Sequence, residues 1–314
     1  MLCHYQFISE RFGNMSIVVV GSVALDSVET PYGKVQNALG GSATYFSVSA
    51  SFFTNDVKLV AVVGEDFPQE HLDFLNSRGI DLEGLERVEG KTFHWSGRYG
   101  ASLSGAETLA TELNVFEKFA PKVPDSYKNS EYVFLANINP ELQMDVLRQV
   151  KNSKLVVCDT MNLWIAERKD QLLETLKYVD ILIINDAEAR QLTDEQKVDM
   201  SARKILEYGP SRVIIKKGEH GAMTLTNSSY FSSPAYPLKL VFDPTGAGDT
   251  FAGGFMGYLA STDDISEQNI RKAIVYGTVM ASFDVEDFSL NRQRILTREE
   301  IETRFAEVKA ITEF

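Results

Sequence analysis

Short, almost continuously apolar runs recur along the chain, and they constrain the fold more than any other feature. They are rich in Val and Ile, and amphipathic segments with helical periodicity, such as 140–152 and 168–179, lie between them. Continuous apolar strands are typical of parallel sheets that helices cover on both faces. We therefore predict an α/β fold with a doubly wound, mainly parallel sheet flanked by helices. The expected strands are 16–21, 57–64, 132–137, 154–160, 180–186 and 212–218.

Two segments break this rhythm. Residues 92–99 alternate in polarity, as a half-exposed strand does, with the aromatic side chains Phe93, Trp95 and Tyr99 on one face. Residues 29–41 are also strand-like and rich in turn residues. The two segments are either ordinary hairpins at the sheet edge or a small β-sheet lid that closes over a substrate and excludes water. We place the segments of this lid near 27–41 and 91–115.

Length and charge narrow the class of protein. The 314 residues suffice for one large α/β domain, which we place at 15–314 after an N-terminal tail at 1–14. The net charge of −13 argues against a nucleic-acid partner, and the sequence has no run of 18 apolar residues that could span a membrane. The only cysteines, Cys3 and Cys158, suggest no disulfide framework, so we expect a cytoplasmic location.

The stretch "DPTGAGDTFAGGF" (243–255) concentrates glycine beside carboxylates. Pro244 cannot continue a central strand, so we expect a turn here and a helix that starts near Asp249. The amides of Gly246, Ala247 and Gly248 would then lie at a helix N-terminus, where an anion binds. Phosphoryl transfer explains both features, because amides stabilise the moving phosphoryl group and a carboxylate accepts a proton. The alternative is that Asp249 only caps the helix.

The same stretch closely resembles the C-terminal signature of the ribokinase family of carbohydrate kinases, also called the phosphofructokinase-B family. Other family landmarks follow in order, and the resemblance covers nearly all of 15–314. It implies a ribokinase-like fold and an ATP-dependent kinase that requires Mg²⁺. The matching segments are "GSVALD" (21–26), "ALGGSAT" (38–44), "VGEDF" (63–67), "NDAE" (185–188) and "KKGEHGA" (216–222).

The resemblance assigns the reacting centre and the acceptor side. It makes Asp249 the catalytic base and 246–248 the anion hole, and we expect a weak base because a helix N-terminus favours the carboxylate. It makes Asp26 the group that accepts two substrate hydroxyls. Gly40 and Gly41 would let a sugar lie against the backbone. From the residues alone, Asp26 and the glycines could equally form ordinary turns.

The resemblance also assigns the nucleotide side. Asn185 and Glu188 would organise Mg²⁺ and its waters, with Glu188 acting through water, although a helix-capping pair explains the same spacing. Lys216, Gly218 and Gly221 would border ATP. Two further positions, Asp243 and Thr245, match those that in some family members help to bind a monovalent cation such as K⁺.

Departures from the family pattern bear on the acceptor. Tyr45 stands where the family commonly has an asparagine, and an aromatic ring favours a flat group such as a base. Lys216 replaces a hydroxyl residue, and a lysine there can contact phosphate. The usual D-P-N-x-R strand end is replaced by "DTMNLW" (159–164). Asn162 in that segment and Asn137 after an earlier strand are candidates for substrate binding.

The leading prediction is a kinase that phosphorylates a primary hydroxyl of a small sugar. A nucleoside kinase, adenosine-like, is the alternative within enzymes. A non-catalytic regulator that binds a sugar or nucleotide is the second alternative. The pattern also leaves open a homodimer that forms through the lid.

Overall fold

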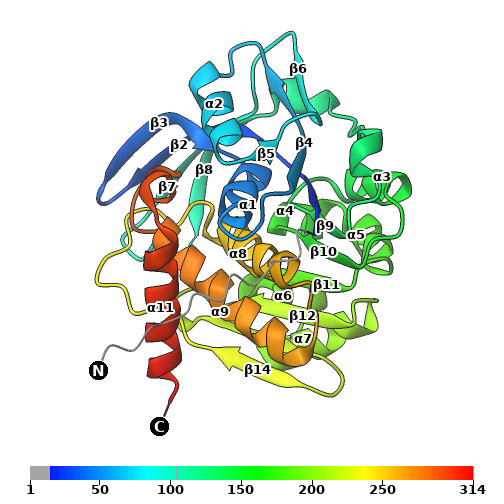
Figure 1. Cartoon of the computed structure of the whole chain (residues 1–314), viewed down its shortest axis with the longest axis vertical. Coiled ribbons are helices and arrows are strands. Elements are labelled where there is room, and N and C mark those ends of the chain that lie inside the picture. Colours follow the sequence, from blue (N-terminus) through cyan, green and yellow to red (C-terminus); the bar gives the residue numbers. More distant parts are fainter. Residues whose placement is uncertain (1–14, 104, 314) are drawn as a thin grey trace, which may run out of the picture.

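The computed structural model describes residues 15–103 and 105–313, and the predicted tail at 1–14 lies outside them (Figure 1). Its larger sheet has the order β14-β13-β12-β11-β10-β9-β1-β4-β5, and β6 also pairs with β4. These strands are β1 (Ile17–Val20), β4 (Val57–Gly64), β5 (Ile80–Asp81), β6 (Leu85–Val88), β9 (Tyr132–Leu135), β10 (Leu155–Asp159), β11 (Ile181–Asn185), β12 (Arg212–Lys216), β13 (Ala222–Leu225) and β14 (Tyr230–Ser233).

The sheet is parallel from β12 through to β5, and only β13 and β14 pair antiparallel at one edge. All six expected strands are present. The alternate residues of β1 show why its sequence is apolar throughout: Ile17 and Val19 face one core, while Val18 and Val20 face the other. The predicted mainly parallel α/β fold is confirmed.

Two layers of helices cover the sheet. One layer contains α1 (Ser42–Ala50), α2 (Gln69–Ser77), α8 (Ala247–Thr262) and α9 (Glu267–Asp284), with α10 (Asn291–Ile295) and α11 (Arg298–Ile311) packed beside α9. The other contains α3 (Pro140–Gln149), α4 (Asn162–Glu167), α5 (Lys169–Leu176), α6 (Asp186–Thr193) and α7 (Val198–Glu207). Short 3₁₀ turns lie at Asn114–Lys118, Asp125–Tyr127 and Gly218–His220.

Close packing explains the glycine pair inside α8. A Cβ on Gly253 would overlap the carbonyl oxygen of Phe46 in α1, and one on Gly254 would lie 2.8 Å from the Met280 side chain in α9. The helix therefore touches both neighbours along its backbone, which offsets the helical cost of two glycines.

A second, smaller sheet projects from this body, at the upper left in Figure 1. Its order is β3-β2-β7-β8, made of β2 (Ala24–Thr30), β3 (Gly33–Gly40), β7 (His94–Tyr99) and β8 (Ala106–Glu112). Both predicted lid segments, near 27–41 and 91–115, contribute strands to it. The simple edge-hairpin alternative is wrong, because among the described residues this sheet does not pair with the larger one. That it closes over a substrate stays a prediction.

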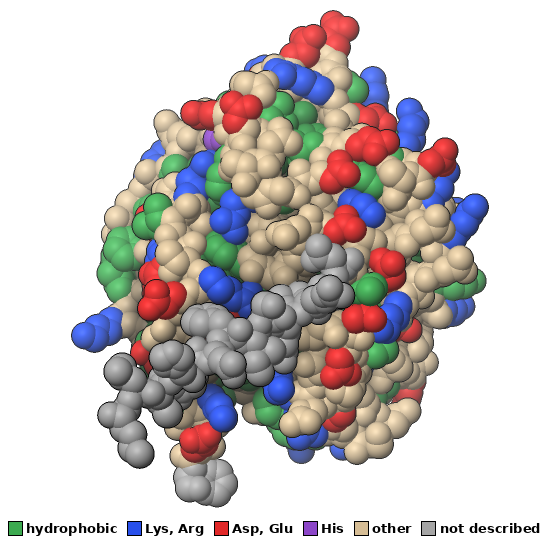
Figure 2. Space-filling model, viewed as in Figure 1, with side chains coloured by type: hydrophobic (Ala, Val, Ile, Leu, Met, Phe, Trp, Pro, Cys, Tyr) green, Lys and Arg blue, Asp and Glu red, His purple; other side chains and the backbone are tan. Residues whose placement is uncertain are grey.

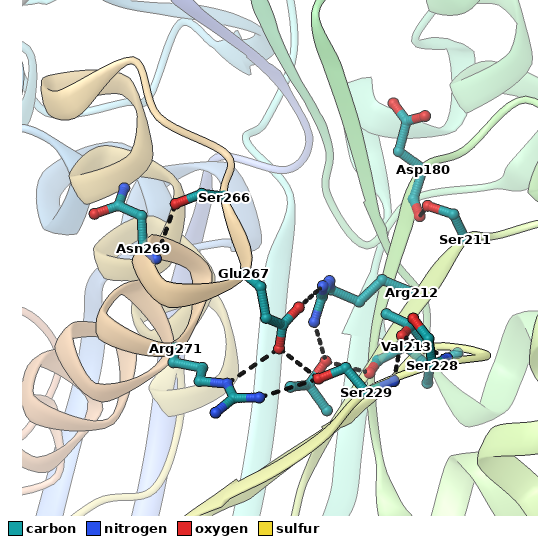
Figure 3. Close-up of polar contacts among 12 residues, drawn as sticks. Asp180, Ser211, Arg212, Val213, Ser228, Ser229, Ser266, Glu267, Asn269 and Arg271 are labelled. Carbon is teal, nitrogen blue, oxygen red and sulfur yellow. Dashed lines mark hydrogen bonds and ion pairs between the residues drawn. The ribbon is translucent and has the colours of Figure 1, made fainter.

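A partly buried ion-pair network connects α9 to the antiparallel edge of the larger sheet. Glu267, at the first turn of α9, forms ion pairs with Arg212 of β12 and with Arg271 one turn further along (Figure 3). Ser229, in the turn before β14, donates a hydrogen bond of 2.7 Å to the same carboxylate. Because the Arg212 side chain is only 9% exposed, this contact replaces its lost hydration.

Charges of both signs intersperse over the face shown in Figure 2, without a continuous block of Lys and Arg. Among residues 15–103 and 105–313, no helix has both the length and the apolarity needed to cross a membrane.

Candidate active site

The glycine-rich loop forms the N-terminus of α8. Gly246 is the residue before the helix, with a left-handed backbone at φ +83°, and the helix begins at Ala247, slightly earlier than expected. A Cβ on Gly246 would also overlap the ring of Tyr45, so both conformation and contact require glycine. Asp249 lies inside the first turn, where its carboxylate accepts a hydrogen bond from its own amide. The predicted glycine turn at a helix N-terminus is confirmed, and the N-cap residue is Gly246 rather than Asp249. The Ala247 amide donates to the Pro244 carbonyl at 3.3 Å, and an anion hole at 246–248 stays a prediction.

Three adjacent strands end in polar residues at one edge of the sheet. β10, β11 and β12 end at Asp159, Asn185 and Lys216, as expected for a site at the carboxyl ends of parallel strands. Lys216 donates a hydrogen bond of 3.0 Å to Asp159 Oδ2. Its ammonium also lies against the loop, because a Cβ on Gly248 would be 2.8 Å from Lys216 Nζ. A cation therefore lies beside the expected anion hole.

Burial and neighbouring charges shift the pKa values of Asp249, Glu188 and Lys216. Burial, reinforced by the charges of Asp159 and Glu188 and opposed by Lys216, raises the pKa of Asp249 to about 7. Burial also raises the pKa of Glu188 to about 7. For Lys216 burial alone would lower the pKa, but Asp159, Glu188 and Asp249 outweigh it and raise the pKa. The expectation of a weak base at Asp249 is wrong in the absence of ligand, because lost hydration outweighs the helix dipole.

Asn185 and Glu188 form a capping box at the start of α6. Asn185 Oδ1 accepts the Glu188 amide at 2.8 Å, and Glu188 Oε2 accepts the Asn185 amide at 3.0 Å. The capping alternative is thus present in the structure, yet it does not exclude the metal role. The charge of Glu188 also acts on Lys216, so this carboxylate faces the same cluster.

The donor set fits Mg²⁺ held mainly through water and phosphate. Among the described residues, no three acidic, histidine or cysteine side chains gather closely enough to hold a metal ion. Mg²⁺ at phosphates usually takes one or two carboxylates and keeps several waters. Glu188 and Asp159 supply such carboxylates beside Lys216, where phosphate would lie.

Asp26 occupies the acceptor side, and the two glycines shape its pocket. It lies in β2, 6% exposed, and accepts a hydrogen bond from the Gly41 amide. Any Cβ on Gly40 would overlap the Asp26 carboxylate, and Gly41 has φ +95°. Burial, with added repulsion from Asp243 and Asp249, raises the pKa of Asp26 to about 7. The carboxylate therefore lies within electrostatic reach of the predicted base.

The small sheet presents aromatic side chains on the same face as Asp26. Trp95 is the register partner of Asp26 in the parallel pair of β2 and β7, so both side chains share one face. The Trp95 ring lies over Gly97, whose Cβ would overlap it. Tyr99, two residues further on, meets Thr245 of the glycine-rich loop, with its hydroxyl 3.2 Å from that of Thr245. This face therefore looks toward the loop.

Other predicted residues lie nearby but are already engaged. Tyr45 is 2% exposed, so its ring supports Gly246 rather than offering a free stacking face. Asn137 accepts a hydrogen bond from the Trp164 indole and donates one to the Met161 sulfur. Asn162 is exposed and accepts the amide of its own neighbour Leu163. Substrate binding by Tyr45, Asn137 and Asn162 stays a prediction.

The remaining predicted positions are the two glycines near the expected nucleotide and the pair expected to bind a monovalent cation. Gly218 has open space around it, whereas Gly221 packs against the backbone of Ser233, which explains that glycine structurally. Asp243 is buried and accepts the amides of Thr245 and Ser289. A monovalent cation at Asp243 and Thr245 stays a prediction.

Sequence reasoning missed Asp159 as a member of the cluster. It is the last residue of an apolar strand, as Asp26 was expected to be, and this position was the available signal. The sequence pattern also predicted Trp95 and Tyr99 as aromatic residues of the lid, but it assigned neither of them to the site. Only strand pairing places Trp95 beside Asp26.

Comparison with known proteins identifies the family of the chain. Residues 14–294 match the pfkB family of carbohydrate kinases. The chain belongs to this family. The chain is 32% identical over 250 residues to a cytidine kinase of Thermococcus kodakarensis, covering 78% of this chain and 88% of that protein.

Solved structures share the fold. A nucleoside kinase of Methanocaldococcus jannaschii superimposes with a TM-score of 0.75 at 21% identity, covering 94% of this chain and 99% of that one. A ribokinase-like protein of Escherichia coli in complex with ATP and Mg²⁺ superimposes with a TM-score of 0.77 at 18% identity, covering 93% and 99%. The family match and the similarity to the cytidine kinase confirm the kinase prediction: this pfkB family chain is an ATP-using phosphotransferase that acts on an alcohol group of a sugar or nucleoside.

Proposed function

We propose that this kinase phosphorylates the primary hydroxyl of a nucleoside. The observation that carries the choice is the half-buried Trp95 ring, on the same sheet face as Asp26. A vicinal diol of a ribose suits the two oxygens of Asp26, and a base attached to that ribose suits a flat indole face. The 32% identical cytidine kinase supports the same class of acceptor.

The chain's own groups supply the chemistry of the transfer. As the acceptor oxygen bonds to the γ-phosphorus, Asp249 takes its proton, and the bond from phosphorus to the bridging oxygen of ADP breaks. The amides of 246–248 and the ammonium of Lys216 stabilise the charge on the moving phosphoryl group. Mg²⁺, near Glu188 and Asp159, would neutralise phosphate charge when bound. Half-burial of Asp249 favours proton uptake at neutral pH.

Several finer predictions remain part of this proposal. Gly218 and Gly221 border the nucleotide, and Asn185 orients Glu188 through the capping box. A K⁺ ion at Asp243 and Thr245, a homodimer through the small sheet and a cytoplasmic location are predictions that need their own tests. The small sheet acts as a lid over the acceptor.

A matched pair of variants tests the acceptor class. Trp95→Ala removes the ring and Trp95→Phe keeps an aromatic face. We expect Trp95→Ala to lower kcat/KM for the productive nucleoside by ~10- to 100-fold, as loss of one stacking contact would, while Trp95→Phe retains most of it. ADP formation with ribose in place of a nucleoside is the internal control. Equal effects of Trp95→Ala on ribose and nucleoside turnover would refute base stacking without refuting the kinase.

A small sugar is the second candidate, because Asp26 alone can hold a diol. It predicts that a free pentose or hexose is phosphorylated faster than any nucleoside, and that Trp95→Ala leaves its KM unchanged. The same panel therefore decides between the two acceptors.

A further inference from the structure

A buried polar cluster lies directly behind the glycine-rich loop. Gln293 of α10 donates one amide hydrogen to Asp284 Oδ1 at 2.7 Å and the other to the Thr250 hydroxyl at 3.2 Å. Asp284 ends α9, and Thr250 follows the base Asp249 in α8. All three residues are buried: Asp284 is 1% exposed, and Gln293 and Thr250 are each 0% exposed. Three helices thus meet at the Gln293 amide, and the Thr250 side chain also hydrogen-bonds to the Asp284 carboxyl group.

Two oxygens of this cluster have no partner among the described residues. They are Asp284 Oδ2 and Gln293 Oε1, and each has less than 1 Å² of exposed surface. An ionised carboxylate and an amide oxygen are both acceptors only, so nothing on either group satisfies these atoms. A buried, unpaired ionised carboxylate costs several kcal/mol, whereas the protonated acid carries a donor of its own.

The surroundings carry negative rather than positive charge. Asp243 and Asp249 both act on Asp284, from the loop and from α8. Asp284 in turn acts on Tyr45 of α1 and Tyr99 of β7. No Lys, Arg or His within 15–103 or 105–313 forms an ion pair with Asp284. Burial, with repulsion from Asp243 and Asp249, outweighs the hydrogen bonds from Gln293 and Thr250 and raises the pKa of Asp284 well above its usual range.

We infer that Asp284 is a neutral, protonated carboxylic acid at physiological pH and that, with Gln293, it is a positioning residue for the catalytic turn. The pair holds the Thr250 side chain, and Ser49 of α1 donates to the Thr250 carbonyl at 2.7 Å. Thr250 is thus held on both sides, and its neighbour Asp249 is carried with it. A positioning error of about 1 Å at a reacting group costs a large factor in rate.

The test uses the conservative variant Asp284→Asn, which has the shape of the protonated acid and cannot ionise. In the unfolded chain Asp284 ionises, so unfolding of the wild-type protein releases a proton and its stability falls as pH rises from about 4 toward the raised pKa. Asp284→Asn lacks this loss. We expect its Tm to match that of the wild-type protein near pH 4 and to exceed it by an amount that grows about 3 °C per pH unit toward pH 8.

Activity supplies the second readout. Asp284→Asn should keep kcat within about 3-fold, because it preserves the amide contact and the neutral charge. Asp284→Ala should lower kcat about 10-fold or more with KM for ATP nearly unchanged, because the loss lies in positioning rather than binding. Asp73→Asn is the matched control, since Asp73 forms the same kind of pair with Gln69 at 2.9 Å on an exposed surface. It should show no growing Tm difference.

Opposite results would overturn the inference. If Asp284→Asn is less stable than the wild-type protein, by an amount that grows with pH, Asp284 is ionised in the folded state. Loss of a K⁺-dependent rise in Tm in the same variant would identify a bound cation as its partner. If Asp284→Ala keeps the wild-type kcat, the pair has no positioning role.

Discussion

The hydroxyl of Thr245 donates a hydrogen bond of 3.2 Å to the hydroxyl of Tyr99, and this contact joins the small sheet to the glycine-rich loop. Further contacts join the small sheet to the main body near this loop. Tyr32, at the turn between β2 and β3, packs on Phe242 with ring centroids 5.6 Å apart, and Ser289 donates to the Leu39 carbonyl at 2.6 Å. The sheet that carries Asp26 is therefore held against the loop that carries Asp249.

Removal of the Tyr99 hydroxyl should weaken the contact between the small sheet and the glycine-rich loop without changing the phosphoryl-transfer step. Tyr99→Phe loses one hydrogen bond, worth about 0.5–1.5 kcal/mol. We expect KM for the acceptor to rise a few-fold while kcat changes less than 2-fold, measured by initial rates of ADP formation. Tyr178→Phe, on an exposed side chain, is the control. A fall in kcat with KM unchanged would instead place Tyr99 in the transition state.

Charge on Lys216 should set the pH at which the kinase works. Lys216 lowers the pKa of Asp249, against burial and the charges of Asp159 and Glu188. In the wild-type protein we expect kcat/KM to rise with pH through a midpoint near 7, as the carboxyl of Asp249, with a pKa of about 7, loses its proton. Lys216→Met should move this midpoint upward by about one unit and lower kcat.

Lys216→Arg keeps the positive charge and is the control for this shift. Its midpoint should stay near that of the wild-type protein even if the rate falls. A midpoint that does not move in Lys216→Met would show that the ammonium does not act on the base. Since Asp26 and Glu188 also have a pKa of about 7, the midpoint belongs to the coupled cluster.

The Asp249 carboxylate should lower the free energy of unfolding at neutral and higher pH. The pKa of Asp249 is raised in the folded state, so its contribution is most favourable at low pH and is lost as pH rises from about 4 to about 7. We expect Asp249→Asn to be about 1–3 kcal/mol more stable than the wild-type protein at pH 8 without ligand, and equal to it near pH 4. Urea unfolding at the two values checks this. Equal stability at both would mean that the carboxylate is well solvated.

The Glu267 network should matter for folding and not for catalysis. Glu267→Gln leaves the buried Arg212 without its ion pair, and we expect a loss of about 1–3 kcal/mol in the free energy of unfolding. Burial opposes ionisation, but bonds from Ser229 and Arg212 lower the pKa of Glu267 to about 2. Its stabilisation is therefore present above about pH 4.5 and lost as pH falls toward 2. Glu299→Gln, on an exposed side chain, should change neither stability nor kcat.

The sequence predicts the frame of this protein well, for identifiable physical reasons. Strands that are buried on both faces need apolar side chains on both faces. Segments 57–64 and 212–218 are therefore recognisable as strands from their composition alone. Glycines that repeat beside Pro244 predict the turn, because few other residues adopt its backbone. The helix start differs slightly from the expectation, since α8 begins at Ala247 and Asp249 lies within its first turn.

The interior of the site depends on contacts that no local pattern contains. The pairing of Lys216 with Asp159 joins residues 57 positions apart, and it exists because β10 and β12 flank β11 in the sheet. Similarly, strand register alone decides that Trp95 lies beside Asp26. The raised pKa of Asp249 arises from burial and from the charges of Asp159 on β10 and Glu188 on α6, which outweigh Lys216 on β12. The helix dipole alone predicts the opposite sign.

The central claim is that Asp249 takes the acceptor's proton while phosphate passes to a nucleoside. The most direct test is ADP formation from ATP and Mg²⁺ over matched panels of nucleosides and free sugars, with Asp249→Asn in parallel. The account predicts that a nucleoside is the best acceptor and that Asp249→Asn lowers its turnover by ~10²–10⁴-fold in a protein that still folds. Undiminished ADP formation in Asp249→Asn would contradict the account, as would ligand-induced stabilisation without any ADP from either panel.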